Sequence, residues 1–103
     1  MIVVYRPAAL HDLRGLVDYL SVTLKNPKAG ARLSARVLHS ISHLKQHPNL
    51  GRKLCDVAEG CDVGIRYLIV EHQLVFYKVD GTTVEVLRIL DGRTDYLTHL
   101  FEE

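Results

Sequence analysis

The dipeptide Asn26-Pro27 constrains the fold more than any other feature of the sequence, because it separates two apolar stripes of helical spacing. Before it, leucine and valine residues recur every three or four positions over residues 8–25, and after it a second stripe spans residues 33–44. Asn is favoured as the residue that caps a helix, and Pro in the first helical turn. A break this short predicts an antiparallel helical hairpin whose two helices pack on a common third surface.

Four runs rich in β-branched and aromatic residues predict the strands of a sheet. One run precedes the helices and three follow them, after an irregular stretch at residues 48–64 that carries proline and glycine. Asp80-Gly81 between the last two runs is a hairpin signal, because a type I′ turn needs two positive φ angles that Asp and Gly tolerate. The four runs cover residues 2–5, 65–70, 74–79 and 82–90.

A turn at Asp80-Gly81 pairs Val79 with Thr82 and so assigns the side chains of the last hairpin to two faces. Both faces carry large apolar side chains, so we expect the helical hairpin to cover one face and something else, such as a partner protein, to cover the other. One face is predicted to hold Val75, Tyr77, Val84, Val86 and Arg88, and the other Leu74, Phe76, Lys78, Glu85, Leu87 and Ile89.

The face on which Arg66 lies depends on the turn that follows its strand. If His72 and Gln73 form a two-residue loop, Arg66 opposes Val79 and shares the face of Arg88. A three-residue loop sends Arg66 to the other face. The sequence leaves both arrangements open.

Length and composition limit the class of protein. With 103 residues, of which 48% are apolar, the chain has the size of a single domain that spans residues 1–103. No apolar stretch approaches the roughly 18 residues that cross a bilayer, and residues 1–5 lack the features of a secretory signal. We therefore expect a cytoplasmic protein with no membrane partner. Cys55 and Cys61 are expected to be reduced thiols rather than a disulfide.

The two halves of the chain carry opposite charge. Residues 1–53 contain nine basic and two acidic residues, a net charge of +7, whereas residues 54–103 contain four basic and ten acidic residues, a net charge of −6. A basic half favours an acidic partner or a phosphate backbone. Mutual neutralisation of the two halves within the fold explains the pattern equally well.

His39, His43 and His47 recur every four residues on the second predicted helix, so their imidazoles form a row. Zinc coordination by this row and one of the two cysteines is one interpretation. A solvent-exposed helix face is the favoured one, because the row lies well around the helix from the apolar stripe. We therefore predict neither a metal site nor a cofactor.

A sparse set of residues near the C-terminus suits phosphate chemistry. Arginines at 66, 88 and 93 could clamp a phosphate, and Tyr96 or His99 could move a proton, which suffices for metal-free cleavage of RNA through its 2′-hydroxyl. The sequence contains no glycine-framed nucleophile and no phosphate-binding glycine loop.

Structural roles for the same residues are favoured over catalytic ones. Arg88 can pair with a carboxylate at the edge of the core, such as Glu71 or Asp91. Tyr96 fits the apolar stripe of a short C-terminal helix that must dock on the rest of the chain.

Four strings occur in an order and spacing that are similar to those of one family. They lie at residues 6–13 with Tyr19, at 47–51, at 66–70 and at 86–96, the last of which ends in a Gly-Arg turn. In these strings the chain resembles the RelE/ParE toxin superfamily of bacterial type II toxin–antitoxin modules. The resemblance implies an α+β fold in which a small twisted antiparallel sheet packs against an N-terminal helical hairpin, followed by a short C-terminal helix. It also implies a cytoplasmic toxin that is neutralised by a cognate antitoxin.

Two activities are implied by this resemblance. RelE-like members cut messenger RNA in the ribosome, whereas ParE-like members poison DNA gyrase through protein contact. The helical hairpin, the Leu-Asp-Gly-Arg ending and the lack of a lysine-rich run are more similar to ParE, although Arg6 replaces the usual capping Ser and Asp91 stands where His is common. We expect a ParE-like gyrase inhibitor. The alternative is a ribosome-dependent mRNA endoribonuclease that uses Arg66, Arg88, Arg93 and Tyr96.

Overall fold

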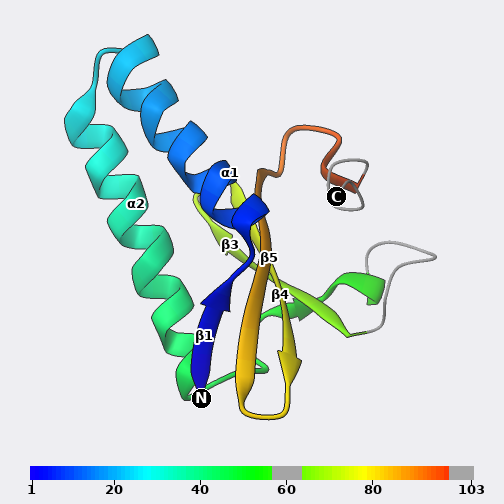
Figure 1. Ribbon diagram of the computed structural model, residues 1–103. Helices are drawn as coiled ribbons and strands as arrows, with labels where there is room; N and C mark the ends of the chain where they lie inside the picture. Colours follow the sequence, from blue (N-terminus) through cyan, green and yellow to red (C-terminus); the bar gives the residue numbers. More distant parts are fainter. Residues whose placement is uncertain (57–63, 98–103) are drawn as a thin grey trace.

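The computed structural model describes residues 1–56 and 64–97 as a two-layer α+β fold (Figure 1). Two long helices lie side by side against one face of a twisted five-stranded sheet. None of the helices in these two ranges is long and apolar enough to cross a membrane. The main elements are β1 (Ile2–Tyr5), α1 (Pro7–Asp18), α2 (Pro27–Ser42), β2 (Arg52–Lys53), β3 (Ile65–Val70), β4 (Gln73–Asp80) and β5 (Thr83–Asp91).

The predicted helical hairpin is confirmed. α1 continues through a π-helical turn at Tyr19–Thr23, and α2 begins at Pro27, where the Asn26 Oδ1 atom accepts a hydrogen bond of 3.1 Å from the Ala29 N–H group. At Gly30 of α2, an added Cβ would lie 2.5 Å from the Ser21 Oγ atom and 3.2 Å from the Val17 carbonyl oxygen. Glycine at this position therefore lets the two arms of the hairpin pack closely.

The strand order is β1-β5-β4-β3-β2, and all neighbouring pairs are antiparallel except one. β1 runs parallel to β5, so the sheet is mixed rather than purely antiparallel. The whole helical hairpin forms part of the long connection that returns the chain to the sheet.

The turn between β4 and β5 differs from the prediction by two residues in register. Asp80 pairs with Thr83, so the loop consists of Gly81 and Thr82 rather than Asp80 and Gly81. Gly81 has a φ of +59°, a conformation that glycine adopts without strain. The predicted pairing of Val79 with Thr82 is therefore wrong.

A β-bulge in the same hairpin changes the assignment of faces. The register shifts between Phe76 and Tyr77, so that Arg88 lies opposite Phe76 and Ile89 lies opposite Val75. Ile89 consequently joins the core under the helices, and its predicted place on the other face is wrong. A bulge adds one residue to one strand, and no hydrophobic pattern in the sequence announces it.

The turn between β3 and β4 also departs from both predicted alternatives. Glu71 and His72 form the loop, Glu71 adopts a positive φ of +56°, and Arg66 lies opposite Tyr77. Because Tyr77 packs against Leu44, in the 3-10 turn that follows α2, Arg66 occupies the helix-covered side of the sheet.

The side of the sheet away from the helices carries a second apolar core. Phe76 is completely buried there, and Leu54, Tyr96 and Leu97 from short flanking segments pack over it. Something other than the helical hairpin does cover this face, as predicted, but the chain's own residues pack there and not a partner protein. The main core under the helices contains Ala9, Leu33, Val37, Ile41, Val70, Val75, Val86 and Ile89.

The described first part of the stretch predicted as irregular, residues 48–56, contains regular structure. It contains the short strand β2 and a 3-10 turn at Leu54–Asp56. Cys55 in this turn is disulfide-bonded, so the prediction of a reduced thiol is wrong for this residue. Cys61, His99 and most of the predicted C-terminal helix lie outside the described residues.

Candidate functional site

Arg66 holds the loop that precedes β2. Its guanidinium NH1 group donates to the carbonyl oxygens of Gly51, at 2.8 Å, and of Asn49, at 3.4 Å. The hydroxyl of the neighbouring Tyr77 accepts from the Gly51 N–H group and donates to the Pro48 carbonyl, both at 2.8 Å. Burial raises the pKa of the Tyr77 hydroxyl, while the hydrogen bond with Gly51 and the charge of Arg66 act in the opposite direction.

Gly51 is required by the same arrangement. A Cβ added there would lie 2.7 Å from the Tyr67 carbonyl oxygen and from the Tyr77 ring, so only glycine fits. The string at residues 47–51 is therefore a structural element in which the side chains of Arg66 and Tyr77 satisfy backbone groups.

Arg88 joins the sheet to α1. Its Nε and NH2 groups donate to the Asp12 Oδ2 and Oδ1 atoms at 2.7 and 2.9 Å, and the Ile89 N–H group donates to Asp12 Oδ2 at 3.0 Å. β1 pairs with β5 only as far as Val86. Beyond the end of β1, the Asp12 carboxylate accepts a hydrogen bond from the β5 backbone in place of a strand partner. The predicted pairing of Arg88 with Glu71 or Asp91 is replaced by a partner 76 residues away in sequence.

Arg93 forms an ion pair with the residue two positions before it. The Arg93 Nε and NH2 groups donate to the Asp91 Oδ1 and Oδ2 atoms at 3.0 and 2.8 Å, and the Arg93 backbone N–H group adds a bond of 2.8 Å to Oδ1. These bonds lower the pKa of Asp91 from 3.8 to about 2. The pair lies at the surface, just after the end of β5.

Tyr96 packs on the second core. Its ring centroid lies 5.7 Å from that of Phe76, with the two planes tilted by 30°. The three arginines thus contact three different partners: loop carbonyls for Arg66, Asp12 for Arg88 and Asp91 for Arg93. A catalytic role for these four residues stays a prediction.

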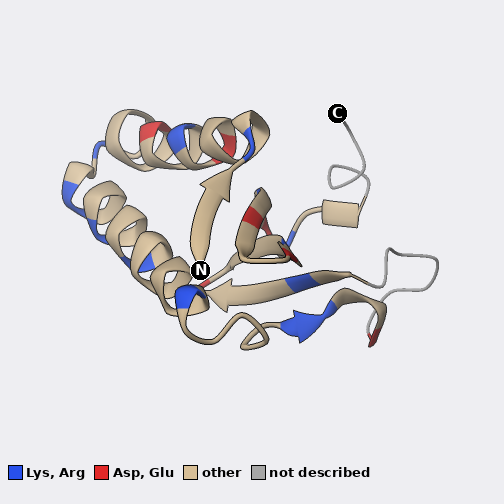
Figure 2. Cartoon of the chain, turned by 60° about the horizontal axis from the view of Figure 1, so that its bottom comes forward, with Lys and Arg blue, Asp and Glu red and all other residues tan. Residues whose placement is uncertain are grey.

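A groove of about 740 Å³ lies between α2 and the end of β3. Arg32 and Arg36 both reach the Glu71 Oε1 atom across it, at 3.7 and 3.1 Å. Figure 2 shows the basic residues spaced along α2, where Lys28 precedes these two arginines. The groove is lined by Arg32, Ala35, Arg36, His39, Ser40, Ile69, Val70 and Glu71.

The outer edge of β3 is unpaired beside this groove. β2 pairs only with Arg66 and Tyr67, so within the described ranges residues 68–70 have no strand partner on that side. Ile69 in this stretch keeps 60% of its surface exposed. An unpaired strand edge with an exposed apolar side chain can accept another extended polypeptide. Sequence reasoning missed this site because nothing in the β3 sequence shows that β2 stops after two residues.

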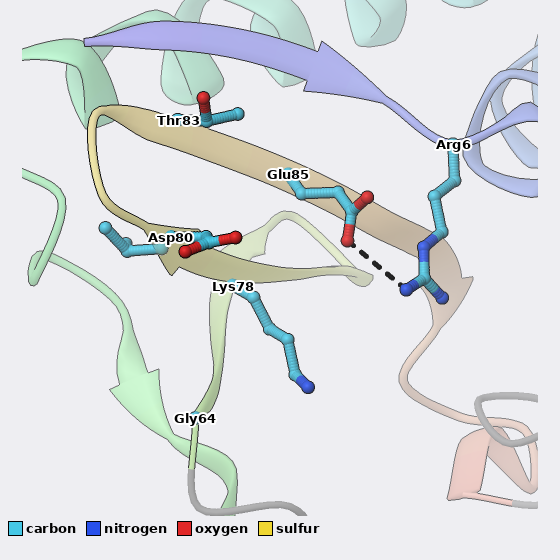
Figure 3. A pocket seen from close by; sticks show the side chains of 7 residues that line it. Arg6, Gly64, Lys78, Asp80, Thr83 and Glu85 are labelled. Carbon is cyan, nitrogen blue, oxygen red and sulfur yellow. Dashed lines mark ion pairs between the residues drawn. The ribbon is translucent and has the colours of Figure 1, made fainter.

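A second hollow, of about 510 Å³, lies at the opposite end of the sheet near the β4–β5 turn (Figure 3). Arg6 forms an ion pair with Glu85 there at 3.2 Å. Lys78 and Asp80 add one charge of each sign, so the lining is balanced and favours neither an anion nor a cation.

The predicted histidine row is only partly realised. The Nε2 atoms of His39 and His43 lie 3.3 Å apart, and both residues are exposed. Among the residues that the structure describes, no three His, Cys, Asp or Glu side chains are placed to hold a metal ion together.

Comparison with known proteins assigns the fold to a family. A family model described as the ParE toxin of the type II toxin–antitoxin system parDE matches residues 3–96. A solved structure from the chromosomal ParDE system of P. aeruginosa is similar with a TM-score of 0.71 and 22% identity, over 88% of this chain and 95% of that chain. No curated protein matches the sequence.

Proposed function

We propose that this chain, which belongs to the ParE toxin family of type II toxin–antitoxin systems, inhibits DNA gyrase by direct protein contact and is neutralised by a cognate antitoxin. Family membership makes the chain a type II toxin. The target and the means of neutralisation are the proposed parts.

The main support for the proposal is that three arginines that could bind a phosphate are bonded to groups of the chain itself. A ribonuclease of this size needs several cations aimed at one phosphate. Here Arg66 bonds backbone carbonyls, Arg88 bonds Asp12 and Arg93 bonds Asp91. Because each guanidinium group already has its own partner, the arrangement supports action through protein contact over cleavage of RNA.

The proposed antitoxin site is the groove between α2 and the edge of β3. Arg32 and Arg36 share the single carboxylate of Glu71, so this part of the groove keeps a positive charge. The exposed side chain of Ile69 and the unpaired edge at residues 68–70 add an apolar contact and backbone hydrogen-bonding groups. These features suit an extended acidic segment that becomes ordered on binding.

The target is tested by adding the purified chain to DNA gyrase in a supercoiling assay, and by inducing its gene alone in cells. We expect inhibition of supercoiling, chromosome breaks and intact messenger RNA, with Arg93→Ala retaining full toxicity. Cleavage of mRNA in translating ribosomes, with unaffected gyrase and loss of toxicity in Arg93→Ala, would contradict the proposal and favour the endoribonuclease.

The antitoxin site is tested with the protein encoded by the adjacent gene. Ile69→Asp places a charge on the exposed β3 edge and is expected to weaken binding of that protein at least tenfold, while toxicity persists. The matched control is Val22→Asp, at a side chain that is 73% exposed near the tip of the helical hairpin. Equal binding by both variants would remove the groove from the interface.

A further inference from the structure

Two histidines one helical turn apart present their ring nitrogens to each other. His39 lies in the last turn of α2 and His43 immediately follows the helix. Their ring centroids are 4.8 Å apart and the rings are nearly perpendicular, at 85°. The two Nε2 atoms approach to 3.3 Å at the solvent-exposed surface.

This separation matches that of two ligands on one metal ion. Imidazole nitrogens bind Zn²⁺ at about 2.0–2.1 Å, which at a tetrahedral angle places the two nitrogens about 3.3 Å apart. One ion can therefore bind both Nε2 atoms with little movement of either ring. Without an ion, the same contact requires one Nε2 to carry a proton and the other to accept it.

The backbone under the pair is well fixed. The opposite face of α2 is buried through Leu33, Val37 and Ile41, and the His43 carbonyl accepts hydrogen bonds from the N–H groups of Gln46 and His47. A metal site on a helix anchored in this way gains affinity because the ligands lose little freedom on binding.

The charge near the histidine pair is only partly balanced. Arg36 lies one turn before His39 and shares the Glu71 Oε1 atom with Arg32, at 3.1 and 3.7 Å. Glu71 therefore reduces, without cancelling, the repulsion that these arginines exert on a metal ion at His39.

We infer that His39 and His43 form a two-ligand site for a divalent transition-metal ion, with solvent completing the coordination. Two nitrogen ligands bind Cu²⁺ and Ni²⁺ more strongly than Mn²⁺ or Fe²⁺, following the general order of first-row ions. The site needs neither His47 nor a cysteine, in contrast to the four-ligand zinc interpretation of the sequence. It does not depend on the proposed function, since a toxin without activity would bind the ion equally well.

The test measures Ni²⁺ binding to the untagged full chain by titration calorimetry in a buffer that does not chelate metals. We expect one Ni²⁺ per chain and a rise in Tm on adding Ni²⁺, because an ion that binds the folded state stabilises it. His39→Ala and His43→Ala should each lower the affinity at least tenfold, and the double variant should lose little more, since either change destroys the chelate.

His47→Ala and His11→Ala are the matched controls and should bind Ni²⁺ as the parent chain does. Circular dichroism checks that each variant is folded, and the electron paramagnetic resonance spectrum of bound Cu²⁺ should show coupling to two ring nitrogens. Absence of Ni²⁺ binding, unchanged affinity in His39→Ala and His43→Ala, or an equal loss in His47→Ala would overturn the inference.

Discussion

The two arginine–aspartate pairs on either side of the end of β5 have nearly the same bonds and opposite surroundings. In each, one guanidinium group meets both carboxylate oxygens at 2.7–3.0 Å. The side chains of Arg88 and Asp12 are only 16% and 10% exposed, whereas those of Arg93 and Asp91 are 68% and 28% exposed. Bond geometry alone therefore does not reveal the role of an ion pair, but burial and sequence separation do.

The buried pair connects two layers of the fold, while the exposed pair closes a local turn. Removal of one member of a buried pair leaves an uncompensated charge in a poorly solvated place. Water and salt screen the exposed pair, so its loss is tolerated.

Asp12→Ala should destabilise the protein by about 3 kcal/mol, because it removes the two hydrogen bonds of a largely buried ion pair with Arg88 and the acceptor of the Ile89 N–H group. Urea unfolding measures the change. The control is Asp18→Ala at the exposed end of the same helix, which should change stability by less than about 0.5 kcal/mol. Similar losses in both variants would remove the contrast between buried and exposed carboxylates.

Tyr77→Phe extends the contrast to an uncharged buried contact. The change leaves the Gly51 N–H group and the Pro48 carbonyl without their partner, so we expect a loss of about 1–2 kcal/mol in urea unfolding. Tyr19→Phe, at an exposed tyrosine, is the control and should have no measurable effect. A loss as large as that of Asp12→Ala would mean that charge adds nothing to the buried contact.

Arg93→Ala should lower the stability at pH 7, in urea unfolding, by less than Tyr77→Phe does, because this arginine is exposed and water screens its pair with Asp91. Its effect should appear in the titration of Asp91, whose pKa should rise from about 2 toward 3.8 when followed by NMR of the carboxyl carbon. A carboxylate with a lowered pKa stabilises the fold above about pH 4, and this contribution is lost as the pH falls toward 2. An unmoved pKa would show that Arg93 does not hold Asp91.

Local features of the fold were predictable and long-range ones were not. The Asn26-Pro27 signal for the start of α2 and the four strand runs depend on neighbouring residues, and the structure confirms them. The bulge at Phe76/Tyr77 and the positive φ of Glu71 set the register, and neither leaves a pattern of side chains.

The candidate site shows the same limit. The sequence suggested a structural role for Arg88, but its partner, Asp12, is 76 residues away and no periodicity connects the two. The role of Arg66 depends on how the chain at residues 47–51 folds back over β3. The groove beside Ile69 exists only because β2 ends after two residues, which follows from packing rather than from composition.

The parallel pairing of β1 with β5 determines when the toxin can become complete during synthesis. Residues 2–5 emerge from the ribosome well before their hydrogen-bonding partners at residues 83–86. The nascent chain can form its helical hairpin early, but the β1–β5 edge of its sheet cannot close until residues 83–86 have been synthesised.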